Sequence, residues 1–111
     1  MSEAGPTFST HILDTQLGAP AAGVHVRLEH VLADGARIPA GEGVTDASGR
    51  IRSLVDGPLV AGAYLLTFDL HDAGGGFFRT VSLEIHVDDP GRSYHVPLLV
   101  APFSITSYRG S

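Results

Sequence analysis

Two histidines near opposite ends of the chain carry the clearest signal for chemistry. His11 lies in the segment 9–14 and His95 in the segment 93–100, and both have mostly apolar neighbours. An imidazole titrates near neutral pH, and partial desolvation among apolar residues tunes its pKa for proton transfer. The pair therefore indicates general acid–base chemistry, although either histidine taken singly fits a structural role in the core or an interface at least as well.

The end of the sequence concentrates several polar groups. Tyr108-Arg109-Gly110-Ser111 follows the second histidine segment and supplies a phenol, a guanidinium, a hydroxyl and a terminal carboxylate within four residues. Chain termini usually fray and carry little chemistry, so such a cluster after an apolar strand is unusual. We expect it to contribute to a binding site.

Other catalytic chemistries find little support in the sequence. There is no Gly-x-Ser-x-Gly elbow, and no acidic residue is placed by pattern to complete a Ser-His-Asp triad. The chain has no cysteine, and neither His11 nor His95 has the spacing of a metal-binding pair. We therefore expect neither a covalent serine mechanism nor a metal or other cofactor.

The segments that position these residues have the periodicity of β-strands. Apolar residues alternate with polar ones over 24–29, 64–70 and 81–87, and clusters rich in Gly, Asp and Pro separate such segments. The helical candidate near 53–60 is interrupted by Gly57-Pro58. The pattern predicts an all-β sandwich of seven or eight strands with at most one short helix.

Composition limits the organisation and the partners of the chain. Its 111 residues suit one domain, which we expect over 8–111 after a flexible segment 1–7. A net charge of −5 without a basic cluster argues against nucleic-acid binding. No apolar run approaches the roughly 20 residues that span a membrane, and the first residues do not resemble a secretory signal. We expect a cytoplasmic protein.

The last long strand predicts self-association. The run 96–103 is almost continuously apolar, and a small sandwich does not cover both faces of such a strand. Exposed apolar strands usually mark an interface.

The two ends of the chain together resemble one known family. Thr10-His11-Ile12-Leu13-Asp14 is similar to its opening Thr-His-x-Leu-Asp segment, and the chain ends in its Tyr-Arg-Gly-Ser tetrapeptide. Between them, 94–99 reads Tyr-His-Val-Pro-Leu-Leu, which is the most specific internal match. The sequence resembles the 5-hydroxyisourate hydrolases, the transthyretin-related enzymes of urate breakdown, over about residues 8–111.

The resemblance implies a set of site residues and a transthyretin-like sandwich. In the family, the opening histidine, the arginine of a Thr-Asn-x-x-Gly-Arg turn, the histidine before Val-Pro-Leu-Leu and the terminal tetrapeptide line the active site. The matching catalytic positions here are His11, Arg50, His95 and Ser111, with Tyr108, Arg109 and Gly110 as substrate-binding residues. The turn reads Thr45-Asp46 here, and Ser93 stands where members often have a further histidine. Without the resemblance, Arg50 is better explained as a residue that caps a turn.

The resemblance also implies the reaction and the assembly. The family hydrolyses 5-hydroxyisourate to 2-oxo-4-hydroxy-4-carboxy-5-ureidoimidazoline in purine catabolism, without a cofactor, by histidine-assisted attack of water. It forms homotetramers whose sites lie between dimers. Two alternatives stay open: a transthyretin-like carrier that binds a small ligand without turnover, and a structural module from a larger surface protein, because the central strands suit many bacterial sandwiches.

Overall fold

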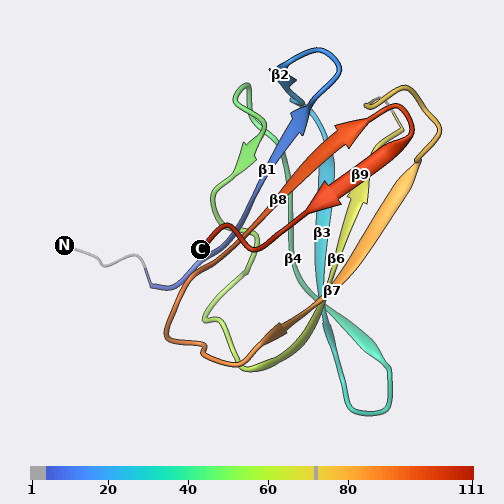
Figure 1. Cartoon of the computed structure of the whole chain (residues 1–111). Coiled ribbons are helices and arrows are strands. Elements are labelled where there is room, and N and C mark those ends of the chain that lie inside the picture. The colour runs from blue at the N-terminus through green and yellow to red at the C-terminus, as the bar shows by residue number, and fades with distance from the viewer. Residues whose placement is uncertain (1–4, 72) are drawn as a thin grey trace.

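The chain folds as two β-sheets, and the elements are marked in Figure 1. The computed structural model describes residues 5–71 and 73–111. Over these residues there are nine strands and no helix: β1 (Phe8–Asp14), β2 (Ala19–Pro20), β3 (His25–Val31), β4 (Arg37–Val44), β5 (Arg50–Ile51), β6 (Gly62–Asp69), β7 (Thr80–Val87), β8 (Tyr94–Ala101) and β9 (Ser104–Ser107). Accordingly, the described part of the chain has no helix that could cross a membrane.

The first sheet joins the two ends of the chain. Its order is β2-β1-β8-β9, and the short β5 pairs with β1 beside β2. The β1–β8 pair is parallel, whereas the other pairs are antiparallel. The second sheet has the antiparallel order β4-β3-β6-β7. Figure 1 shows the two sheets as the layers of a sandwich, with the first strand, β1, and the last, β9, in the first layer.

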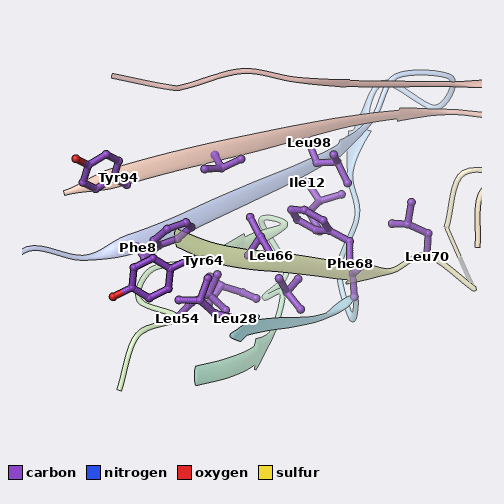
Figure 2. Close-up of a cluster of buried hydrophobic side chains, with 14 of the residues drawn as sticks. Phe8, Ile12, Leu28, Leu54, Tyr64, Leu66, Phe68, Leu70, Tyr94 and Leu98 are labelled. Carbon is purple, nitrogen blue, oxygen red and sulfur yellow. The ribbon is translucent and has the colours of Figure 1, made fainter. Parts of the chain in front are cut away.

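The core lies between the two layers and is built from alternate residues of each strand. Phe8 and Ile12 of β1, Leu66 and Phe68 of β6 and Leu98 of β8 are fully buried, and Figure 2 shows them facing one another. Burial of each such side chain contributes about 1.5–3 kcal/mol. Strand period two therefore places every second residue of β1 and β8 on the outer face of the first sheet.

The fold agrees with the predicted all-β sandwich and refines it. The count rises to nine strands because β2 and β5 have only two residues each. The segment near 53–60 contains no helix; it is an irregular connection whose Leu54 and Leu59 are buried in the core. Of the predicted flexible segment 1–7, residues 1–4 lie outside the described part, whereas Thr7 donates to Ser93 Oγ and accepts from the Tyr94 amide.

Candidate active site

The parallel pairing of β1 with β8 sets Ser9 beside His95. The two residues are register partners, and both project from the outer face of the first sheet. Ser9 Oγ lies 2.8 Å from His95 Nδ1 and 3.5 Å from the Tyr94 carbonyl oxygen. Alternation along each strand predicts the outward direction of both side chains, but only the topology brings together residues 86 positions apart.

The antiparallel pairing of β1 with β5 sets His11 directly opposite Arg50. Residues opposite each other in an antiparallel pair share a face of the sheet, so Arg50 also lies on the outer face. His11 Nε2 is 2.9 Å from the Ser48 carbonyl oxygen. Since a carbonyl oxygen only accepts, the imidazole donates its Nε2–H in this bond.

The turn before Arg50 is held by the carboxylate of Asp46. Its Oδ1 accepts from the amides of Ser48 and Arg50 at 2.8 and 3.0 Å. These bonds, first that of Arg50 and then that of Ser48, hold the pKa of the exposed Asp46 carboxyl below its usual value. Gly49 has a φ of 76°, and a Cβ there would overlap the Ile12 carbonyl, so the turn lies directly on β1. The turn thus fixes the backbone position of Arg50, from which the guanidinium side chain extends.

His95 is half-buried, and its surroundings favour the neutral imidazole. Burial lowers its pKa most, followed by the positive charge of Arg50 and then by His11. A neutral imidazole has one unprotonated nitrogen that accepts a proton, which suits a general base.

The C-terminal tail folds back onto the same histidine. The amide of Gly110 donates to the His95 carbonyl oxygen at 2.7 Å. A Cβ at residue 110 would lie 2.5 Å from His95 Cδ2, so the tail approaches the imidazole as closely as it does because residue 110 is glycine. The next residue is Ser111, which is therefore one peptide unit away from this contact.

Arg109 and Tyr108 face a different part of the molecule. They line a cavity of about 520 Å³ between β7 and the end of β9. The Arg109 guanidinium lies over the Tyr94 ring, 5.4 Å from its centroid. The Tyr94 hydroxyl donates to Asp88 at 2.9 Å, and this bond is the main cause that lowers the pKa of the Asp88 carboxyl.

The residues predicted from the sequence therefore fall into two neighbouring groups. Arg50 and His95 line one shallow cavity of about 390 Å³ together with Ser9, and His11 stands opposite Arg50 at its side. Tyr108 and Arg109 line the larger cavity, and His95 borders both. Sequence reasoning missed Ser9, Asp46 and Tyr94 as members of this region. For Ser9 a signal was present, since it shares the outer face of its strand with His11.

Among residues 5–71 and 73–111, no three His, Asp or Glu side chains are arranged to hold a metal ion.

The fold consists of an antiparallel four-stranded sheet packed on a sheet that contains the parallel β1–β8 pair, which defines a transthyretin-like sandwich. Histidines and an arginine lie on the outer face of the sheet that contains this pair. Comparison with known proteins agrees with this class. The HIUase/Transthyretin family model matches residues 8–110, and the chain belongs to that family.

Individual relatives span nearly the whole chain. A 5-hydroxyisourate hydrolase of Deinococcus radiodurans is 42% identical over 116 residues, covering 96% of this chain and 97% of the relative. The structure of Klebsiella pneumoniae 5-hydroxyisourate hydrolase has a TM-score of 0.77 at 35% identity and covers 95% of this chain and 99% of that one. Sea bream transthyretin in complex with thyroxine has a TM-score of 0.80 at 30% identity, with 92% of both chains covered.

Proposed function

We propose that this protein is a 5-hydroxyisourate hydrolase, which opens the six-membered ring of its substrate by attack of water. The observation that carries the proposal is the joint placement of His95 and Arg50 on one cavity, with His11 beside them, on the outer face of the sheet. Relatives that carry this name at 36–42% identity support it.

The reaction requires a base, an oxyanion partner and an acid. One imidazole of the His11–His95 pair takes a proton from water as the water oxygen bonds to the ring carbonyl carbon. The ring C–N bond then breaks, and the leaving nitrogen receives a proton from an imidazole. Of the two hydrogens of the water, one ends on the leaving nitrogen and the other stays on the oxygen that has bonded to the carbonyl carbon. General acid–base help of this kind is typically worth about 10²–10⁴-fold.

Arg50 suits the role of the electrostatic partner. Its guanidinium is always charged and presents donors in a planar fork, which fits a substrate oxygen on which negative charge develops. The same charge disfavours the protonated form of His95. The C-terminal tail remains a proposed part of the site, with Tyr108, Arg109, Gly110 and Ser111 as its members. The contact of Gly110 with His95 supports this proposal.

Direct assay tests the proposal. Purified protein is mixed with freshly made 5-hydroxyisourate, and the ultraviolet decay of the substrate is compared with its spontaneous decay. Acceleration that disappears in the His95→Ala variant is expected. Saturable binding of the substrate without acceleration would instead favour a carrier, the function that the thyroxine complex of the sea bream relative illustrates.

We further propose a homotetramer with sites between dimers. Phe103 in the β8–β9 turn is 78% exposed and Leu17 in the β1–β2 turn is 74% exposed, and such large apolar side chains favour contact with other copies. Within the described residues, β7 and β9 each have one unpaired edge, and both edges border the larger cavity.

Residues 8–111 are proposed as the single domain, and a cytoplasmic location remains a prediction that cell fractionation tests.

A further inference from the structure

The Ser9 hydroxyl has two neighbours but only one hydrogen to donate. His95 Nδ1 lies 2.8 Å away, and the Tyr94 carbonyl oxygen lies 3.5 Å away. The carbonyl oxygen has no hydrogen and only accepts. Both contacts are therefore hydrogen bonds only if the hydroxyl donates to Tyr94 and His95 donates its Nδ1–H to the hydroxyl.

The alternative arrangement satisfies fewer groups. If Ser9 donated to His95 Nδ1, the Tyr94 carbonyl would lose this donor, and the imidazole hydrogen would be on Nε2. The imidazole lines the same cavity as the positive Arg50 guanidinium, whose charge acts on the ring. An unprotonated nitrogen, with its lone pair, is the better neighbour for a cation.

Nε2 is the ring nitrogen of His95 that forms no hydrogen bond with the described residues. Ser9 holds Nδ1 of the same ring. His11 is held by the other ring nitrogen, because its Nε2–H donates to the Ser48 carbonyl. The two histidines are thus held by different nitrogens and present different atoms to a substrate.

We propose that Ser9 is a positioning residue that holds neutral His95 in the Nδ1–H tautomer, so that Nε2 is the atom that takes the proton from the attacking water. The step rests on the proposed hydrolysis. The water proton moves to Nε2, the hydroxide oxygen bonds to the carbonyl carbon, and the imidazolium keeps its Nδ1–H on Ser9. When the ring C–N bond breaks, Nε2 returns its proton to the leaving nitrogen and the original tautomer is restored.

Nitrogen-15 NMR of the ligand-free protein tests the tautomer without any assay of activity. The imidazole resonances of His95 are assigned by their loss in the His95→Gln variant. In the wild-type protein at a pH where His95 is neutral, we expect a protonated Nδ1 and an unprotonated Nε2. In Ser9→Ala, the ring loses its partner and the Nε2–H tautomer becomes populated, whereas Ser9→Thr keeps the hydroxyl and restores the wild-type spectrum.

Kinetics then test whether the tautomer matters for turnover. We expect Ser9→Ala to lower kcat about tenfold with little change in KM, in line with the loss of one hydrogen bond that orients the base. Ser9→Thr should recover most of the rate. Thr15→Val is the matched control, because it removes a hydroxyl bond just past the end of β1, 3.2 Å to the Val100 carbonyl of β8, away from His95.

The outcomes separate the two proposals. An Nε2–H tautomer in the wild-type protein, or an unchanged His95 spectrum in Ser9→Ala, overturns the role of Ser9 even if the protein hydrolyses 5-hydroxyisourate. Equal losses of kcat in Ser9→Ala and Thr15→Val also overturn it, since loss of stability would then account for both. A wild-type protein with the expected tautomer and no hydrolysis would refute the proposed reaction alone.

Discussion

The proposed reaction relies on His11 and His95 as a pair around one attacking water, so their contributions should not be independent. Replacing either with alanine is expected to lower kcat by about 10²–10⁴-fold, equivalent to about 3–5 kcal/mol of barrier. The double variant should be scarcely worse than the worse single variant. Steady-state kinetics of the three variants, with circular dichroism as the folding control, make the measurement. Strictly additive losses would contradict a shared unit.

The environment of His95 predicts its pH dependence. Burial, Arg50 and His11 lower its pKa, so the neutral base should persist below the ordinary histidine value of about 6.5. The acid limb of kcat/KM should therefore have its midpoint below about 6.5. In Arg50→Gln, an NMR titration of His95 should show a higher midpoint because a positive neighbour is gone. A midpoint that moves down or stays constant would exclude the influence of Arg50.

The same pKa shift has a consequence for stability. The unfolded chain binds a proton at this histidine more readily than the folded chain does, so stability is unaffected well above about pH 6.5 and falls as the pH drops from there through the lower folded pKa. Because the group is only half-buried, the effect on the free energy of unfolding is expected to be small.

Among the elements, the turn that ends at Arg50 is the clearest device for positioning. Asp46→Asn keeps an oxygen that accepts from the Ser48 and Arg50 amides, so we expect activity close to wild type. Asp46→Ala removes the acceptor and should lower kcat/KM several-fold as the turn loosens. The same assay compares both variants. Equal effects of the two substitutions would show that the charge, and not the acceptor, is what matters.

The tail is a second positioning element. Gly110→Ala introduces a methyl group against the His95 ring, so the tail or the imidazole must move, and we expect at least a tenfold loss of kcat/KM. Gly5→Ala is the control, because a Cβ there meets no other atom within 4 Å. Full activity of Gly110→Ala, with an unchanged His95 NMR spectrum, would show that the tail does not restrain the histidine.

Sequence patterns predicted the faces of these elements better than their neighbours. Alternation along β1 and β8 agrees with the outward direction of His11 and His95 and with the burial of Phe8 and Leu98, and it can be read from the sequence alone. It did not predict the parallel register of Ser9 with His95, because pairing across 86 residues depends on the whole topology. The stacking of Arg109 on Tyr94 was also missed, since an irregular tail has no periodicity from which its direction follows.

At the scale of the molecule, the exposed turns predict the assembly. Phe103→Asp places a charge where one of the most exposed large apolar side chains lies, and we expect the tetramer to dissociate in analytical ultracentrifugation, with a loss of hydrolysis if sites form between dimers. Glu42→Gln, an exposed polar change on β4 of the second sheet and away from both cavities, is the control. A Phe103→Asp protein that stays tetrameric would place the interface elsewhere.

The parallel β1–β8 pair also has a consequence for synthesis. Because β1 (8–14) pairs with β8 (94–100), a growing chain on the ribosome has nothing to pair with β1 on that side until residues 94–100 have been synthesised. Contacts between such distant segments close slowly, since a long loop must be ordered first. A chain that stops before residue 94 would therefore leave this edge of β1 unpaired and would lack His95, so we expect it to show no hydrolysis.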